Sequence, residues 1–217
     1  SYRRTFTVPT DWDGREIYLN FDGVDSFFYL WINGKYVGFS KNSRNLASFN
    51  ITKYLVEGEN LIAVEVYRNS DASFLESQDM FRLPGIFRTV SLTSRNPIEL
   101  RDIRVRTDLD AQYKDAVANI EVDVRNLTKK AAKNYQVKVQ LYKNELYSDN
   151  NEIVEGATAV NAVSQIANGE TTTVNIPLAV ANPAKWSAEE PNRYTLVVSL
   201  IDKKGRTVEM ASTYMGF

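Results

Sequence analysis

The chain has 217 residues, 43% of them hydrophobic and 12% aromatic, and its 26 Lys and Arg side chains against 27 Asp and Glu leave a formal net charge of -1. The length suits one large domain or two modest ones with a sizeable core, and the balanced charge gives no reason to expect nucleic acid or a membrane as a partner. Because the chain contains neither Cys nor His, it has no disulfide, no thiolate nucleophile and no His general base, so any catalysis would depend on carboxylates, Tyr or Lys.

The first part of the chain alternates apolar and polar residues, which predicts half-buried β-strands. Three sets of residues carry this alternation: Ile17, Leu19 and Phe21; Ile62, Val64 and Val66; and Ile86, Arg88, Val90 and Leu92. The last set predicts one strand that runs to about residue 93. Between the first two sets, Asn33-Gly34 separates two aromatic-rich runs, which is the strongest short signal for a β-hairpin. Residues 52–55 predict a single helical turn, and helical patterns are otherwise almost absent.

The stretch RNSDASFLESQDMFRLPGIFR, residues 68–88, has neither a strand period nor a helical one. It mixes large apolar side chains with three acids, Asp71, Glu76 and Asp79. Acids among aromatic residues are costly unless they are paired or bind something. Two interpretations stay open: Asp79 pairs with Arg82 or Arg88 to hold a crossover loop on the domain, or one acid projects towards a ligand or another domain.

A domain boundary is predicted at Asn96-Pro97, because Pro lacks the amide donor that strand pairing requires. Beyond it, aromatic residues become rare and alternating β-branched residues predict about seven short strands over roughly 120 residues, with a hairpin turn at residues 202–207. That profile is typical of an immunoglobulin-like sandwich without a disulfide. The predicted fold is therefore all-β, with two β-sandwiches in series that span residues 1–95 and 96–217.

Several residues could carry carbohydrate chemistry. Glycoside hydrolysis needs two carboxylates about 5 to 10 Å apart, but we interpret Glu189-Glu190, Asn144-Glu145 and Asn151-Glu152 as surface residues. Sugars could also stack on aromatic rings. The hairpin rings, Phe27, Phe28, Tyr29, Trp31 and Tyr36, are interpreted as core, and Trp12 in the turn TDWDG is the better candidate for an exposed ring.

Longer segments resemble a known family. SQDMFRLPGIFRTVSL (residues 77–92) and FDGVDSFFYLWINGKYVGFSKNSR (residues 21–44) closely resemble the N-terminal sugar-binding domain of glycoside hydrolase family 2, in particular that of the large bacterial β-galactosidases. NPAKWSAEEPNRYTLVVSL (residues 182–200) and the final MGF (residues 215–217) resemble the family's immunoglobulin-like domain and its exit into a barrel. β-Glucuronidases share this architecture, but the run Gln78-Asp79-Met80-Phe81 fits the β-galactosidase branch better.

The resemblance implies that this chain has no catalytic domain. In that family the acid/base and the nucleophile are glutamates of a (β/α)₈ barrel that begins just after the segment ending here at Phe217, and further strands precede the position that matches Ser1. The chain is therefore expected to be an excised piece with a cropped jelly-roll domain and a complete immunoglobulin-like domain. It is expected to be inactive alone, whereas its parent would hydrolyse terminal β-D-galactosides.

The resemblance assigns a function to one residue, Asp71. In the large β-galactosidases the aspartate of an Arg-x-Ser-Asp-Gly-Ser segment enters the barrel's active site and binds galactosyl hydroxyls and a sodium ion. Residues 68–73 read Arg-Asn-Ser-Asp-Ala-Ser, so Asp71 is expected to bind substrate and sodium, in the intact parent only. Ala72 stands where Gly is usual, and a positive φ there would change the path of the loop. The isolated chain is expected to bind neither metal nor galactose.

The remaining expectations concern partners and alternatives. No cofactor is expected in this chain, and the resemblance allows sodium and magnesium in the parent. The expected partners are the barrel of the same polypeptide and a galactoside. The parent would be cytoplasmic or periplasmic, and the resemblance also allows a homo-oligomer. Three alternatives stay open: a β-glucuronidase-type parent, a self-sufficient carbohydrate-binding module that uses rings such as Trp12, and an adhesin-like pair of sandwiches without an exposed apolar patch at residues 74–87.

Overall fold

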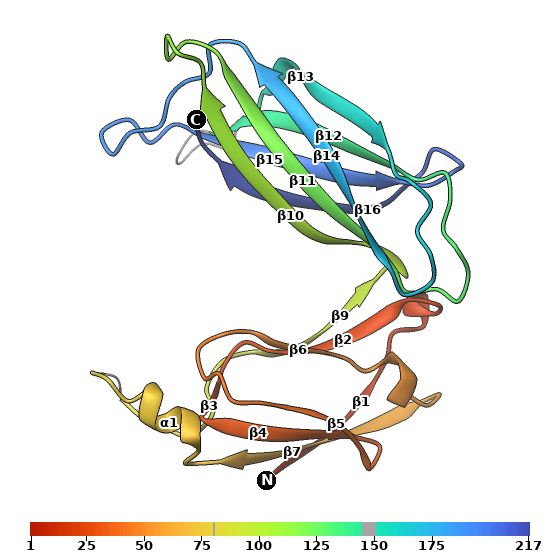
Figure 1. Ribbon diagram of the computed structural model, residues 1–217. Helices are drawn as coiled ribbons and strands as arrows, with labels where there is room; N and C mark the ends of the chain where they lie inside the picture. The colour runs from red at the N-terminus through yellow and green to blue at the C-terminus, as the bar shows by residue number, and fades with distance from the viewer. Residues whose placement is uncertain (80, 145–150) are drawn as a thin grey trace. The chain divides into compact units, whose positions relative to one another are not determined.

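The computed structural model describes residues 1–79, 81–144 and 151–217, and these form two compact units, Ser1–Arg95 and Asn96–Phe217. In both units the regular secondary structure is almost entirely β-strand (Figure 1). The predicted fold class, all-β with one sandwich following another along the chain, is confirmed. The interpretations that involve Met80 and Glu145 lie outside the described residues.

The first unit contains two main sheets. The larger one has the order β1-β7-β4-β5, and its strands are β1 (Tyr2–Thr7), β7 (Glu59–Tyr67), β4 (Phe27–Ile32) and β5 (Lys35–Ser40). The second has the order β6-β2-β9, formed by β6 (Ala47–Asn50), β2 (Glu16–Phe21) and β9 (Val90–Arg95). A short pair joins β3 (Val24–Asp25) to β8 (Gly85–Ile86), and two single turns of 3-10 helix, η1 (Thr10–Trp12) and η2 (Thr52–Tyr54), complete the unit.

The core of the first unit lies between these sheets. Its fully or almost fully buried apolar side chains come mainly from alternate positions of β2 and β4, namely Ile17, Leu19, Phe21, Phe28, Leu30 and Ile32. The predicted hairpin joins β4 to β5. Asn33 and Gly34 have φ of 51° and 75°, the left-handed conformations that a tight two-residue turn requires. The turn predicted at residues 52–55 is η2.

Several sequence predictions for the first unit are wrong. The set Ile86 to Leu92 does not form one strand, because residues 87–89 separate β8 from β9. Residues 68–88 are not wholly irregular, since they contain the short helix α1 (Asp71–Leu75). The hairpin aromatics are not all core. Only Phe28 is buried there, and Phe27, Tyr29 and Trp31 point away from it, as the alternation along β4 requires.

The second unit is a seven-stranded sandwich within the described residues. One sheet has the order β10-β11-β14, from β10 (Ile98–Leu109), β11 (Ala116–Asn126) and β14 (Thr171–Val180). The other has the order β13-β12-β15-β16, from β13 (Ile153–Ala162), β12 (Gln136–Asn144), β15 (Arg193–Ile201) and β16 (Thr207–Met215). All neighbouring strands are antiparallel, and the predicted turn at residues 202–207 joins β15 to β16.

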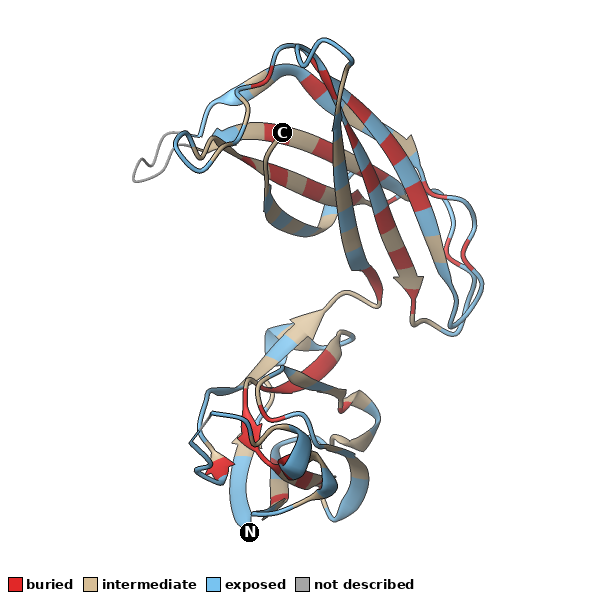
Figure 2. Ribbon diagram, turned by 60° about the vertical axis from the view of Figure 1, so that its left-hand side comes forward, coloured by how far each residue is buried: buried red, intermediate tan, exposed pale blue. Residues whose placement is uncertain are grey.

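Along the strands of the second unit, buried residues alternate with exposed ones, and the buried ones form its core. Figure 2 shows bands of buried and exposed residues along its strands. Val137, Val139 and Leu141 of β12 are fully buried against Ile120 and Val122 of β11, within one continuous core. Each such side chain contributes about 1.5–3 kcal/mol by leaving water.

In the described part of the chain, no helix has the length and apolar character needed to cross a membrane.

Candidate functional site

The loop that joins β7 to β8 is the most unusual segment of the first unit. It leaves the end of β7 at Tyr67 and forms α1 (Figure 1). At its end, β8 pairs with β3. It contains the acids and the apolar residues that the sequence singled out, and the structure shows how each of them is held or exposed.

Hydroxyl groups fasten the start of this loop. The amide of Ser70 donates to Ser73 Oγ at 2.9 Å, and Ser73 Oγ donates to Ser26 Oγ at 2.9 Å. Ser73 is buried, so each partner satisfies a group that water cannot reach. The Ser70-x-x-Ser73 spacing is a capping pattern at the start of α1, and it was the one signal in the sequence that could have predicted this helix.

Asp71 is the first residue of α1, and its carboxylate faces solvent. Lys41 Nζ lies 2.9 Å from Asp71 Oδ2, and the Ala72 amide donates to Asp71 Oδ1 at 2.9 Å. The side chains of Lys41 and Asp71 are 49% and 75% exposed. The hydrogen bond from the Lys41 ammonium, followed by that from the Ala72 amide, holds the pKa of the Asp71 carboxyl below its usual range. Lys41 could not be identified from the sequence, because thirty positions separate it from Asp71 and no motif links them.

Ala72 adopts helical backbone geometry. It lies inside α1 and is not one of the non-glycine residues with positive φ. A glycine is therefore not required at this position for the path that the loop takes here.

The other two acids of the loop behave differently. Glu76 turns back to the domain and accepts hydrogen bonds from the Ser43 amide at 3.0 Å and from Ser43 Oγ at 2.5 Å. Asp79 is exposed and belongs to none of the ion pairs of the described residues. Among the described residues no ion pair joins Asp79 to Arg82 or Arg88, and Arg88 donates instead to the Arg44 carbonyl at 2.9 Å. The first of the two interpretations left open by the sequence, in which Asp79 pairs with one of these arginines, is therefore wrong.

Large apolar side chains of the loop point into solvent. Phe74, Leu75, Phe81 and Leu83 are 81%, 82%, 89% and 73% exposed. Isolated exposed apolar residues are normal, but four of them in one short loop form the kind of patch that marks an interaction surface. Their exposure contradicts the adhesin-like alternative, which predicted no such patch.

The described residues offer no ready-made metal centre. No group of three or more acidic side chains comes together among them in a way that could hold a metal ion. Asp71 supplies a single carboxylate, one oxygen of which already contacts the Lys41 ammonium. A hard cation prefers several oxygen ligands at once, and the side chains of residues 1–79, 81–144 and 151–217 do not gather such a set of carboxylates.

A second feature of the first unit is the aromatic face, the outward side of the sheet formed by β7, β4 and β5. It consists of Phe27, Tyr29, Trp31, Tyr36, Phe39 and Tyr67. Trp12, which we predicted to be the exposed ring, is instead partly buried and packs against the core. That prediction is wrong because η1 folds the turn onto the domain.

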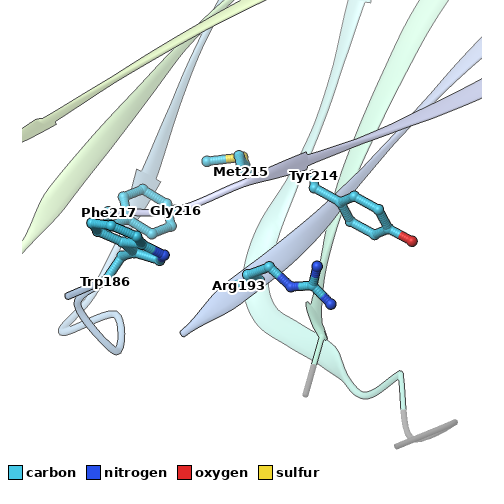
Figure 3. A pocket seen from close by; sticks show the side chains of 6 residues that line it. All are labelled: Trp186, Arg193, Tyr214, Met215, Gly216 and Phe217. Atoms are coloured by element: carbon cyan, nitrogen blue, oxygen red, sulfur yellow. The ribbon is translucent and has the colours of Figure 1, made fainter. Parts of the chain in front are cut away.

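The second unit has a shallow pocket near its last residues, lined by Trp186, Arg193, Tyr214, Met215, Gly216 and Phe217 (Figure 3). The Trp186 amide donates to the Phe217 carbonyl at 2.7 Å, and the Arg193 guanidinium lies 4.9 Å from the centre of the Tyr214 ring.

The acids that the sequence predicted to be at the surface are exposed, namely Glu152, Glu189 and Glu190. Glu152 also pairs with Lys143 at 3.2 Å.

Two family models match the chain from end to end. Residues 1–97 match the model described as glycosyl hydrolases family 2, sugar binding domain, and residues 98–217 match the model described as glycosyl hydrolases family 2. Among curated relatives, β-galactosidases of Priestia megaterium and Pseudoalteromonas haloplanktis are 42% and 38% identical over the whole chain. The chain spans about 20% of the length of each.

Solved structures share the fold. A β-glucuronidase of Bacteroides uniformis superposes with a TM-score of 0.87 at 24% identity, covering 99% of this chain and 26% of that one. A β-glycosidase of Bacteroides vulgatus superposes with a TM-score of 0.77 at 26% identity, covering 100% of this chain and 25% of that one. At 24% identity, the likeness to the β-glucuronidase concerns the fold alone.

Proposed function

This chain belongs to glycosyl hydrolase family 2, and from that premise we propose that it is the accessory, non-catalytic part of a longer β-galactosidase. In this proposal the rest of the polypeptide supplies the catalytic residues, and the first unit lends its β7–β8 loop to the active site. The substrate class would be terminal β-galactosides, as the names of the curated relatives suggest.

One observation carries the proposal, namely that an exposed carboxylate and an exposed apolar patch occupy the same loop. Phe74, Leu75, Phe81 and Leu83 would be an aggregation hazard if nothing covered them, and together they suit a buried contact with another protein surface. Covering them would bring Asp71, three residues before Phe74, to the edge of that contact. A carboxylate there could accept hydrogen bonds from sugar hydroxyls.

We propose that Asp71 binds the substrate and does not act as a catalytic acid. Its pKa is below the usual range, so the group is ionised near neutral pH and cannot donate a proton to a leaving group. The structure gives no support for Asp71 as a sodium ligand in this chain, because its cation partner is Lys41. No step of the proposed role depends on a metal ion.

The activity of the longer protein tests the role of Asp71. A hydrogen bond to a charged group contributes about 1.5–3 kcal/mol, so Asp71→Asn should raise KM for a nitrophenyl β-galactoside about ten- to hundred-fold. Asp11→Asn is the matched control, since Asp11 is also an exposed acid near the start of a short helical turn. Equal kinetics for the two variants would contradict the role of Asp71.

Two measurements test the accessory role. The isolated chain should not hydrolyse the galactoside faster than buffer does, and hydrolysis that depended on its own acids would overturn the proposal. Carbene labelling should modify Phe81 and Leu83 in the isolated chain and leave both protected in the longer protein, whereas Tyr113, which is also highly exposed, serves as the reference. Equal labelling of Phe81 in both proteins would show that the loop is not an interface.

A further inference from the structure

We propose that Asn168, in the connection between β13 and β14, is a site of spontaneous deamidation, whereas Asn33 is protected from the same reaction. Both are followed by glycine, and the sequence contains no other Asn-Gly pair. The proposal concerns a chemical modification of the second unit and does not rest on the proposed function.

Deamidation of an Asn-Gly pair needs no enzyme and no cofactor. The backbone nitrogen of the glycine attacks the side-chain carbonyl carbon (Cγ) of the asparagine and forms a C–N bond. The side-chain NH₂ group leaves as ammonia, taking the proton of the glycine amide with it, and a succinimide ring remains. Water opens this ring at either carbonyl, so the products are aspartate and isoaspartate, in which the backbone runs through the side chain. Glycine favours the attack because it has no Cβ beside the nitrogen.

Hydrogen bonds hold the side chain of Asn33 in place. Its Nδ2 donates to the Tyr54 carbonyl at 3.0 Å and to Asn60 Oδ1 at 2.8 Å. Its Oδ1 accepts from the Leu61 amide at 2.8 Å. Ring closure expels Nδ2 and moves Cγ, so the two donated bonds are lost and the accepted bond is disturbed. Asn60 is 1% exposed, so the loss would leave a buried oxygen with fewer hydrogen bonds.

The side chain of Asn168 is free to react. It is exposed, and among the residues that the structure describes its amide group has no hydrogen-bond partner. Asn168 and Gly169 are the central residues of a tight turn. The Glu170 amide closes this turn by donating to the Ala167 carbonyl at 3.2 Å. Within the described residues, one hydrogen bond opposes the attack, because the Gly169 amide donates to the Asn126 carbonyl at 2.9 Å.

This difference in hydrogen bonds predicts a difference in rate. In the described part of the chain, deamidation at Asn33 disturbs three side-chain bonds, whereas the attack at Asn168 disturbs one backbone bond. At the net strength usual for hydrogen bonds in folded proteins, two additional bonds slow a reaction about five- to hundred-fold. We therefore expect Asn168 to convert faster than Asn33 by this factor in the folded chain.

Conversion to isoaspartate at position 168 would disturb a buried polar centre. Asn126 is fully buried, and its Nδ2 donates to the carbonyls of Ile166 at 3.1 Å and Ala167 at 3.2 Å. Its backbone also pairs with the turn, since its amide donates to the Glu170 carbonyl at 2.9 Å. Isoaspartate adds one atom to the backbone of the turn, so we expect some of these bonds to be lost. The loss leaves buried polar groups without partners, which lowers the stability of the second unit.

Mass spectrometry of the isolated chain tests the proposal. The chain is kept folded in a mildly alkaline buffer and is then cleaved after glutamate at acidic pH, where deamidation is slow. Cleavage after Glu155 and Glu170 releases residues 156–170, which contain Asn168 and, as an internal control, Asn161, which alanine follows. We expect residue 168 to gain the mass difference between asparagine and aspartate about five to a hundred times faster than residue 33. Asn161 should stay unchanged.

The same chain in guanidinium chloride is the reference for the intrinsic rates. Unfolding removes the hydrogen bonds of Asn33, so both Asn-Gly pairs should then convert at similar rates. In the folded chain, a rate at residue 33 equal to or above that at residue 168 would overturn the proposal. It would also be overturned if residue 168 converted in denaturant and stayed unchanged in the folded chain over the same period.

A stability measurement tests the expected effect on Asn126. Asn168→Asp has the charge of the modified chain and a normal backbone, so it should unfold at nearly the same urea concentration as the original chain. The incubated chain that contains isoaspartate at position 168 should unfold at a lower urea concentration. If the incubated and the fresh chain unfolded together, the modification would not disturb the hydrogen bonds of Asn126, and this part of the proposal would be wrong.

Discussion

The substitution Ser73→Ala tests how the β7–β8 loop is held. Ser73 Oγ makes two hydrogen bonds in a buried position, one from the Ser70 amide and one to Ser26 Oγ, both 2.9 Å long. Each bond contributes about 0.5–1.5 kcal/mol net, so removing both should lower the free energy of local opening by about 1–3 kcal/mol. The strands of the core do not depend on these bonds, so the stability of the whole unit should change less.

Native-state hydrogen exchange measures this local opening. The Glu76 amide, which donates to the Ala72 carbonyl at 2.9 Å, reports on α1 and should exchange about five- to hundred-fold faster in Ser73→Ala. Ser77→Ala is the control, because it removes a hydroxyl that donates to the Phe74 carbonyl at 2.9 Å on the exposed side of the same loop. If the Glu76 amide exchanged at the same rate in both variants, the buried hydroxyls would not be what holds the loop.

Three further substitutions test other parts of the structure. Lys41→Met should raise the pKa of Asp71 towards its usual value, which a carboxyl NMR titration measures. Because the pKa of Asp71 is lower in the folded protein than in the unfolded one, the Lys41–Asp71 pair stabilises the fold at pH values above the unfolded pKa. This stabilisation is lost as the pH falls through the folded pKa. Leu141→Ala should cost the second unit about 3–5 kcal/mol in urea unfolding and leave the first unit unaffected, because Leu141 is fully buried in the second core. Gly34→Ala should destabilise the first unit by about 1 kcal/mol in the same assay, since Gly34 has φ of 75°, and an unchanged midpoint would show that the turn can relax.

Strand positions were predictable wherever one side of a sheet is buried. Side chains in a strand alternate between two sides, so an alternating sequence such as that of β11 or β12 indicates both the strand and its inward residues. The Asn33-Gly34 pair was equally informative, because few other residues accept positive φ at both positions of the turn. β1 and β6 escaped prediction because they are partly or largely exposed and carry mixed side chains.

Alternation does not tell which side of a strand is covered. On β4 both sides are apolar, with Phe28, Leu30 and Ile32 on one and Phe27, Tyr29 and Trp31 on the other. The sequence alone favoured burial for the large rings, and the structure buries the aliphatic side with Phe28 instead. The aromatic face could not be predicted because it depends on rings from three strands that meet only in the folded sheet.

In the candidate site, too, features set by neighbouring residues were predictable from the sequence, whereas contacts between distant residues were not. The Ser70-x-x-Ser73 spacing is local, and it accounts for the start of α1. The partners that fix the loop, Ser26, Lys41 and Ser43, lie 47, 30 and 33 positions before the loop residues that they contact, and the folding of the strands brings them together. These contacts therefore cannot be predicted from the spacing of the residues in the sequence.

The fastening of the loop accounts for its exposed apolar residues. The loop is attached to the rest of the domain by hydrogen bonds of Ser73 and Glu76. The exposed side chains of Phe74, Leu75 and Phe81 do not contribute to this attachment. Apolar side chains that stay exposed in the folded domain gain their burial free energy only when another surface covers them. That gain is about 25 cal/mol for each Å² removed from water. A loop that is rigid before contact also loses less conformational entropy on binding than a disordered one. In the proposed role, the polar anchors hold the loop on the domain, and the exposed apolar side chains beside Asp71 provide the surface that the rest of the polypeptide would cover.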